Sequence, residues 1–304
     1  MSDTGRASER RTPRLDPLAV RRLLRDEGLR ARHSLSQNFL ADPDVLEAIL
    51  AEADPSPGDR VLEIGPGLGI LTGALLEAGA AVTAVELDWR LAALVRKRLS
   101  DAVDRAAQDP SGPGSLTLIE GDALDQDLPN VVAPPFSVVA NLPYHITSPI
   151  LHRLLQAAPR PTRMVLMVQW EVAERIAAPP GRMSYLSVFV QYHATVRIVR
   201  RVPAEAFEPA PSIASAVIVV EPRSDNAGKL ARPADEDALW ALVQTGFRER
   251  RKMVRNVLAR QLRVGQPRVD AALESVGISG DRRPQTLTVE EWIALRAALD
   301  GPDA

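Results

Sequence analysis

The chain has 304 residues, a formal net charge of −2 and 45% hydrophobic residues, and it contains no cysteine. This length suits one large domain with a small one, and the lack of cysteine excludes disulfides, thiolate metal sites and cysteine nucleophiles. The four histidines lie far apart in the sequence, so we expect no metal site. No apolar stretch is long enough to span a membrane, and the first residues do not form a signal peptide, which favours a cytoplasmic protein.

Arginine supplies nearly all the positive charge and concentrates in two places. The first is residues 6–32, and we expect residues 1–30 to form a flexible extension. The second is a run near the C-terminus that consists of Arg248, Arg250, Arg251, Lys252 and Arg255. Such clusters can bind phosphates even on a nearly neutral protein. The alternative is a solvated surface, which would have the same pattern of charges.

Short apolar runs alternate with helical segments through the middle of the chain. Seven strands are predicted, at residues 60–64, 81–86, 115–120, 136–140, 163–168, within 186–199, and at 215–220. The first five are almost continuously apolar, as in parallel strands that are covered on both faces. Apolar residues at helical spacing lie between them, over residues 68–78, 89–103 and 148–157. This alternation predicts a doubly wound α/β sheet, in which the last two strands can pair antiparallel at the edge.

The character of the chain changes after residue 220. Residues 221–228 are typical of a linker, and the rest of the chain has a helical pattern. Asp235 is expected to cap a helix that runs through Phe247 to Leu258, with shorter helices near residues 269–276 and 289–299. The sequence therefore predicts an extension over residues 1–30, an α/β domain over 31–224 and a small all-α domain over 225–304.

A glycine-rich turn follows the first strand and contains Gly65 and Gly67. Glycine lets the backbone of such a turn approach a ligand closely, but dehydrogenases bind dinucleotides with a similar turn. Glu86 ends the next strand, where a carboxylate can accept the two ribose hydroxyls, and Asp122 follows the third strand, where it can accept from an adenine amino group. The alternative is that both acids start or cap helices. Taken together on successive strand ends, they predict a site for an adenosyl ligand without a pyrophosphate.

The fourth strand leads into Asn141-Leu142-Pro143-Tyr144. An amino nitrogen on adenine is a poor nucleophile because its lone pair is delocalised into the ring. The Asn141 side-chain oxygen and the Leu142 carbonyl can accept its two N–H groups and so expose the lone pair. Pro143 fixes the turn, and Tyr144 offers a face for an extruded base. The alternative is an ordinary turn between a strand and a loop.

With these motifs, the chain resembles the ribosomal RNA adenine dimethyltransferase family, and within it the small-subunit enzymes whose loss confers kasugamycin resistance. The resemblance runs from His33 nearly to the C-terminus. Besides the glycine turn, Asp122 and the Asn141 motif, it rests on Ser36-Gln37-Asn38-Phe39-Leu40, on Gln169 with Glu171-Val172-Ala173-Glu174-Arg175-Ile176, on Phe207-Glu208-Pro209-Ala210-Pro211 with Ser215-Ala216-Val217, and on Phe247-Arg248-Glu249-Arg250-Arg251-Lys252 with Arg255-Asn256.

The resemblance implies a seven-stranded, mostly parallel, Rossmann-like class I methyltransferase sheet. It implies N6,N6-dimethylation of two adjacent adenines near the 3′ end of 16S rRNA in the immature small subunit, by a monomer without a metal. S-adenosylmethionine is the implied methyl donor. The family's cofactor contacts fall on Asn38, Leu40, Gly65, Gly67, Glu86, Asp122 and Asn141. The C-terminal arginine run becomes a predicted RNA-binding element.

Three departures from the family pattern concern the RNA substrate. Ser36 stands where small-subunit enzymes usually have glycine, and Trp170 and Ala210 each stand where lysine is usual. One alternative is therefore a large-subunit (23S) rRNA methylase of the macrolide-resistance type. Another is an RNA-binding assembly factor that has lost catalysis, which the intact Glu86, Asp122 and Asn141 motifs disfavour. A nicotinamide dehydrogenase would share only the glycine turn.

Overall fold

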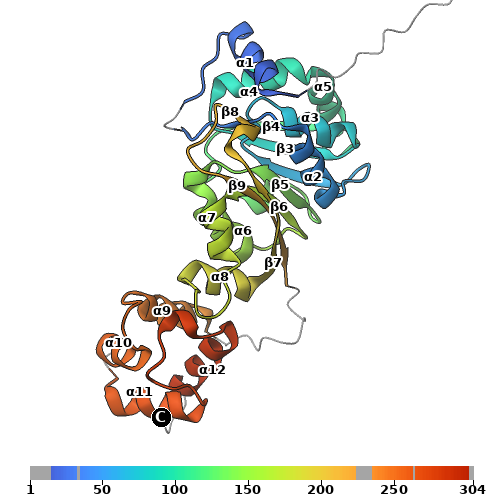
Figure 1. Ribbon diagram of the computed structural model, residues 1–304. Helices are drawn as coiled ribbons and strands as arrows, with labels where there is room; N and C mark the ends of the chain where they lie inside the picture. Colours follow the sequence, from blue (N-terminus) through green and yellow to red (C-terminus); the bar gives the residue numbers. More distant parts are fainter. Residues whose placement is uncertain (1–14, 33–34, 224–234, 263, 301–304) are drawn as a thin grey trace, which may run out of the picture.

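The computed structural model describes residues 15–32, 35–223, 235–262 and 264–300, and its centre is a seven-stranded sheet (Figure 1). The strands lie in the order β4-β3-β2-β5-β6-β9-β7. Their bounds are β2 Arg60–Ile64, β3 Ala81–Glu86, β4 Leu116–Glu120, β5 Ser137–Asn141, β6 Met164–Gln169, β7 Ala194–Val202 and β9 Ser215–Pro222. The first five are parallel, and β9 runs antiparallel to both β6 and β7. The predicted parallel strands and the antiparallel edge pair are confirmed.

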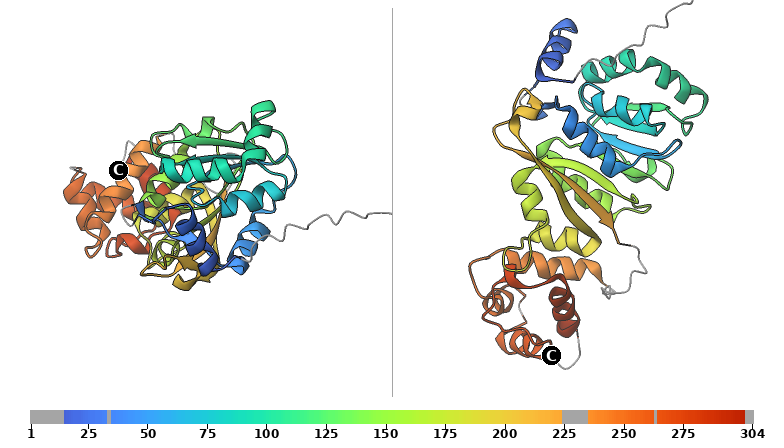
Figure 2. Two further views of the ribbon diagram at one scale, coloured as in Figure 1. Left: turned by 90° about the horizontal axis from the view of Figure 1, so that it is seen from above. Right: turned by 45° about the vertical axis from the view of Figure 1, so that its right-hand side comes forward.

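Helices cover both faces of the sheet, as predicted for a doubly wound fold (Figure 2). One face carries α2 (Pro43–Ala53), α3 (Ile70–Glu77), α4 (Trp89–Arg98) and α5 (Ser100–Gln108). The other carries α6 (Thr147–Gln156), α7 (Trp170–Ile176) and α8 (Tyr185–His193). Strand β6 is apolar throughout because both of its faces are covered. Val165 and Met167 face the first layer of helices, whereas Leu166 and Val168 face the second.

Residues 186–199, within which the sequence predicts a strand, form most of a helix and the start of a strand. The first half is helix α8, and strand β7 begins only at Ala194. The cause is local, because Ser184 and Ser187 form a capping box that starts a helix. The buried Leu186, Phe189, Val190 and His193 follow at helical spacing. In the same way, the helix predicted over residues 89–103 is divided at Leu99 into α4 and α5.

Part of the predicted N-terminal extension is a docked helix, α1 (Pro17–Asp26). Asp16 caps it by accepting from the Ala19 N–H at 2.8 Å. Val20 and Leu24, four residues apart, are buried against Phe39 and its neighbours. The expectation of a flexible segment is thus wrong for residues 15–30, because this helix has an apolar stripe to bury; residues 1–14 lie outside the described residues.

The C-terminal part is all-helical, as predicted, and holds α9 (Glu236–Phe247), α10 (Val254–Gln261), α11 (Gln266–Ser275) and α12 (Val289–Asp300). Asp235 caps α9 through the Ala238 N–H. The predicted continuation of this helix to Leu258 is wrong, since α9 ends at Phe247. The first N–H groups of α10 donate instead to the carbonyls of Arg282 and Gly280, which turns α10 back on the bundle. Residues 224–234 of the predicted linker lie outside the described residues.

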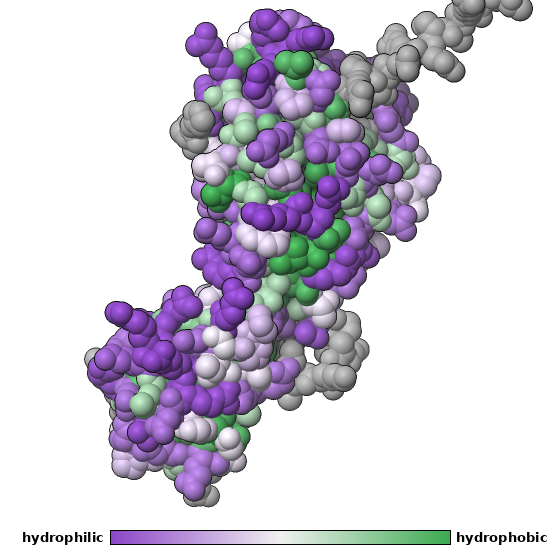
Figure 3. Space-filling model, viewed as in Figure 1, coloured by the Kyte–Doolittle hydropathy of each residue, from purple (hydrophilic) through white to green (hydrophobic). Residues whose placement is uncertain are grey.

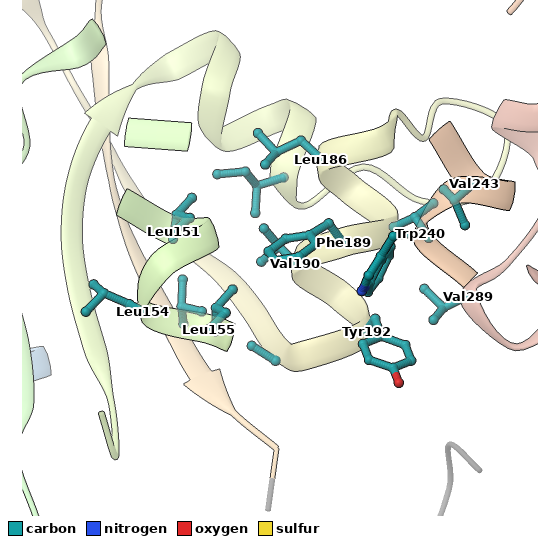
Figure 4. Close-up of a cluster of buried hydrophobic side chains, with 14 of the residues drawn as sticks. Leu151, Leu154, Leu155, Leu186, Phe189, Val190, Tyr192, Trp240, Val243 and Val289 are labelled. Atoms are coloured by element: carbon teal, nitrogen blue, oxygen red, sulfur yellow. The ribbon is translucent and has the colours of Figure 1, made fainter. Parts of the chain in front are cut away.

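The C-terminal helices and the sheet domain share one hydrophobic core (Figure 4). Trp240 of α9 lies between two rings of α8, with centroids 5.1 Å from Phe189 and 5.0 Å from Tyr192. Val243 of α9 and Val289 of α12 belong to the same cluster. Within the described ranges, no helix is both long and apolar enough to cross a membrane.

Gly246 of α9 is required by packing against the fully buried Trp292. A Cβ at this position would overlap Trp292 Cη2 and approach Cζ3 to 3.2 Å. We expect Gly246→Ala to lower the free energy of unfolding by about 1–3 kcal/mol, because overpacking outweighs the better helix propensity of alanine. Urea unfolding measures this change.

Gly73 of α3 provides the matched control, since the nearest atom to its added Cβ is Leu99 Cδ2 at 3.9 Å. Gly73→Ala should leave stability unchanged or raise it by up to about 1 kcal/mol. A Gly246→Ala protein as stable as the Gly73→Ala protein would contradict this account of the packing.

Candidate active site

One pocket at the carboxyl ends of the parallel strands brings the predicted cofactor and catalytic residues together. It lies where the strand order reverses between β2 and β5, the usual position of a ligand in such sheets. All ten predicted residues line it: Asn38, Leu40, Gly65, Gly67, Glu86, Asp122, Asn141, Leu142, Pro143 and Tyr144. The C-terminal arginine run does not line it.

The glycine turn forms the floor of the pocket next to β2. Gly67 has a φ of +57°, and a Cβ there would lie 3.1 Å from Phe39 Cδ1. A side chain would therefore be strained by the backbone and crowded by the ring. Pro143 lies directly against the turn, since a Cβ on Gly65 would be 3.5 Å from Pro143 Cδ. The predicted binding turn and the predicted catalytic turn are thus in contact.

Glu86 is 6% exposed, and each of its oxygens accepts one backbone N–H. Gly67 donates to Oε2 at 3.0 Å and Asp88 donates to Oε1 at 2.8 Å. Burial raises the pKa of Glu86, while these hydrogen bonds oppose the rise. A carboxylate has about four acceptor positions, so Glu86 keeps capacity for a ligand hydroxyl. The acid that caps α4 is Asp88, which leaves Glu86 for the pocket.

Asp122 serves a local role as well as facing the pocket. Its Oδ1 accepts from the Leu124 N–H at 2.8 Å, which closes a turn rather than capping a helix. This bond fixes the carboxylate at the end of β4, where it lines the pocket. The alternative that Asp122 caps a helix is therefore wrong, because a turn follows the acid, and its carboxylate still lines the pocket.

The orientation of the Asn141 amide is fixed from outside its own strand. Asn141 Nδ2 donates to the Asn38 carbonyl at 3.1 Å, so Oδ1 is the end of the amide available to accept from a ligand. The Asn38 side chain itself turns back to donate to the Ser36 carbonyl. Leu142 is buried beside Asn141, with its N–H bonded to the Met167 carbonyl. The structure thus assigns Asn38 a contact that the sequence alone does not suggest.

Tyr144 is anchored at its far end. Its hydroxyl lies 2.8 Å from the hydroxyl of the fully buried Ser215 at the start of β9. Burial raises the pKa of Tyr144, so the phenol stays neutral. A ring that is fixed at its hydroxyl gives a flat base a preformed surface to stack on. Ser215 is not among the predicted site residues, although it begins the Ser215-Ala216-Val217 motif of the family resemblance.

A further pair of side chains holds the segment that carries Asn38. Gln37 Nε2 donates to Asp88 Oδ2 at 3.2 Å, and Gln37 Oε1 accepts from the Arg32 N–H at 2.8 Å. Hydrogen bonds from Arg90 and Gln37 lower the pKa of Asp88 to about 2. Sequence reasoning misses this pair because 51 residues separate Gln37 from Asp88, and no local pattern relates them.

Glu63, the fourth residue of β2, is a second acid beneath the pocket that sequence reasoning leaves without a role. It is 1% exposed, and its Oε2 has no hydrogen-bond partner among the described residues. Burial and the nearby Glu86 raise the pKa of Glu63 to about 8, against a smaller opposing effect of the Thr72 hydroxyl. The floor of the pocket therefore holds two acids with raised pKa values.

Four of the five predicted RNA-binding residues lie on the turn between α9 and α10, and the fifth, Arg255, is the second residue of α10. Arg248, Arg250, Arg251 and Lys252 are exposed, whereas Arg255 is half-buried and pairs with Asp281 at 2.9 Å. Among the described residues, Arg250, Arg251 and Lys252 have no carboxylate partner. Hydrophilic side chains cover much of this part of the molecule on the face shown in Figure 3.

Comparison with known proteins shows which family has this site. The family model for ribosomal RNA adenine dimethylases matches residues 28–299, which is most of the chain. The chain belongs to this family. It is 40% identical over 294 residues to the ribosomal RNA small subunit methyltransferase A of Anaeromyxobacter sp. (strain K), covering 92% of this chain and 97% of that one. It is also 40% identical over 287 residues to the protein of the same name from Geobacter sulfurreducens, covering 91% and 98%.

Two solved structures place the fold of this adenine dimethylase among the Rossmann-like methyltransferases. The crystal structure of the 23S rRNA methyltransferase ErmE is 30% identical with a TM-score of 0.66, covering 87% of this chain and all of that one. A dimethyladenosine transferase from Plasmodium falciparum is 26% identical with a TM-score of 0.69, covering 84% and 95%. The predicted class I methyltransferase fold is confirmed.

Proposed function

We propose that this adenine dimethylase transfers methyl groups from S-adenosylmethionine to N6 of two adjacent adenines near the 3′ end of 16S rRNA, within the immature small subunit. The observation that carries the chemistry is the fixed amide of Asn141 beside the Leu142 backbone at the end of β5. The name of the relatives at 40% identity supports the small subunit as the source of the RNA.

The residues of the pocket fit the proposed methyl donor. Gly65 and Gly67 bring a bare backbone to the ligand, Glu86 keeps acceptor capacity for a ribose hydroxyl, and Asp122 faces the pocket where an adenine amino group can donate. Asn38 and Leu40 form part of the wall contributed by the segment before α2. When bound, S-adenosylmethionine supplies an electrophilic methyl group on a sulfonium centre.

The chain's own residues then prepare the nucleophile. In the first transfer, the Asn141 Oδ1 and the Leu142 carbonyl accept the two N–H groups of adenine N6, which draws the lone pair out of conjugation with the ring. The Tyr144 ring, held by Ser215, stacks against the base. Orientation supplies most of the acceleration, and the proton leaves after attack, so no general base is needed beforehand.

The choice of ribosomal subunit rests on the relatives that match nearly the whole chain. Those at 40% identity are named ribosomal RNA small subunit methyltransferase A. The intact Asn141, Glu86 and Asp122 support catalysis over an RNA-binding role alone. We further propose that the protein works as a monomer in the cytoplasm.

The deciding experiment supplies the protein with labelled S-adenosylmethionine and, in separate reactions, undermethylated small subunits or 23S rRNA. Mapping the modified positions should give N6,N6-dimethyladenosine at two adjacent adenines near the 3′ end of 16S rRNA. Label confined to 23S rRNA would overturn the assignment of the subunit. Absence of transfer to both substrates would favour a binding-only protein.

The exposed C-terminal turn is the proposed RNA-binding element. Reversing the charge at Arg251 and Lys252 should weaken binding to the small subunit and lower its dependence on salt concentration, since fewer phosphates are neutralised. Filter binding at several salt concentrations measures both. Reversal of Arg260, which already pairs with Glu249 at 3.0 Å, is the control. Binding that is unchanged in the Arg251 and Lys252 variant would make the turn an ordinary solvated surface.

A further inference from the structure

A guanidinium lies over an aromatic ring at the carboxyl edge of the sheet. Arg201 Cζ, near the end of β7, is 5.3 Å from the centroid of the Trp170 ring at the start of α7. Arg201 is exposed and Trp170 is half-buried. Neither residue takes part in the cofactor or base contacts described above.

The Arg201–Trp170 pair lies next to the residues that connect Tyr144 to strand β9. Tyr144 reaches Ser215 of β9 through its hydroxyl. Ser215 is paired with Gln169 on one side and with Val202 on the other, and these residues are the chain neighbours of Trp170 and Arg201. The Trp170 N–H also donates to the Ala214 carbonyl at 3.0 Å. Arg201 therefore lies at the same edge as the base-stacking tyrosine, beyond its hydroxyl end.

The three arginines of β7 differ in what they bind. Arg197 donates to Glu52 Oε1 at 2.9 Å, and Arg200 donates to the Asp44 carbonyl at 3.0 Å. The Arg201 side chain makes no hydrogen bond or ion pair with any residue in the described part of the chain, and its guanidinium lies over the Trp170 ring. Stacking of this kind holds a guanidinium flat while it leaves the N–H groups at its edge free to donate. The Arg201 guanidinium is therefore held in place with its N–H groups available to bind an anion.

We propose that Arg201, held by Trp170, binds a backbone phosphate of the RNA strand beside the adenine in the pocket. The proposal rests on the proposed function, which makes RNA the substrate. A base that is extruded into the pocket brings its flanking phosphates to the rim, and the fork of donors on arginine matches phosphate oxygens. Phosphate contacts of this kind set the register of a strand rather than read its sequence.

The test compares Arg201→Gln with Arg197→Gln, a matched loss of an exposed arginine from the same strand. Methylation of undermethylated small subunits is measured over a range of salt concentrations. Arg201→Gln should raise KM for the subunits by about fivefold or more and reduce the slope of log affinity against log salt by roughly 0.7–1. The Kd for S-adenosylmethionine, measured separately, should not change. Arg197→Gln should match the wild type in all three quantities.

Trp170 supplies a second measurement, because we infer that it acts through Arg201. Trp170→Leu should give part of the KM increase, and it should add nothing further in the Arg201→Gln background. Independent, additive effects would show that Trp170 does not position the guanidinium.

The outcomes separate this proposal from the one on which it rests. Wild-type methylation of the small subunit, with KM and salt slope unchanged in Arg201→Gln, overturns the phosphate site alone. A wild-type protein that modifies no adenine in the small subunit overturns the proposed function, and this site with it. Loss of affinity in Arg201→Gln but not in Arg197→Gln supports both.

Discussion

Asn141→Ala should slow methyl transfer by about 30- to 1000-fold under single-turnover conditions. This range corresponds to roughly 2–4 kcal/mol of lost transition-state stabilisation, by analogy with the removal of one polar group from an oxyanion hole. The physical reason is that the Asn141 amide is already oriented by the Asn38 carbonyl, so its oxygen meets the developing charge on N6 without reorganisation.

Binding and chemistry must be measured apart, because Asn141 also lines the cofactor pocket. Calorimetric titration with S-adenosylmethionine gives the cofactor affinity, and rapid quench gives the rate at saturating cofactor and subunits. The exposed Asn130, whose amide bonds to Asp127, provides a control asparagine whose replacement by alanine should leave the rate unchanged. A wild-type rate in Asn141→Ala would refute the proposed activation of N6.

Glu63 should make the stability of the ligand-free protein fall as pH rises. Its pKa is about 8 in the folded protein and has the ordinary value of 4.5 in the unfolded chain. The stabilisation of the protonated form is therefore complete below about pH 4.5, and it is lost as pH rises through about 8. Over the whole window the loss amounts to roughly 5 kcal/mol at most.

Glu63→Gln isolates this effect, because glutamine is neutral at every pH and has nearly the shape of the protonated acid. The difference in unfolding free energy between Glu63→Gln and the wild type should grow by about 1.4 kcal/mol per pH unit between pH 5.5 and 7.5. Urea titrations at three pH values measure it. The same substitution at the exposed Glu77 of α3 is the control. A difference that is constant with pH would show that Glu63 does not titrate in this range.

The sequence predicts most of the sheet because its parallel strands are apolar on both faces. The predicted bounds of β2 and β3 agree with the structure to the residue. Around α8 the same reasoning fails, since nearly every residue from Leu186 to His193 is buried, and continuous burial hides the helical period. The helix within residues 15–30 is missed for the opposite reason: a stripe of two buried residues, Val20 and Leu24, is a weak signal among many arginines.

The members of the candidate site could be predicted, but the contacts between them could not. Each predicted pocket residue follows a strand or lies in a motif, and strand ends meet at one edge of a parallel sheet. The Asn141 amide, however, is set by a carbonyl 103 residues away, and Tyr144 by a hydroxyl 71 residues away. Such pairings depend on how loops cross the sheet, which no periodicity in the sequence encodes.

The insertion of Trp240 between Phe189 and Tyr192 has a consequence for how the protein folds and comes apart. A chain cut before α9 would leave these rings of α8 facing water, and the buried side of α9 would lose its partner as well. In the intact protein, neither the sheet domain nor the C-terminal bundle can therefore unfold without exposing part of the core of the other. We therefore expect the sheet and the C-terminal bundle to unfold together, in one thermal transition.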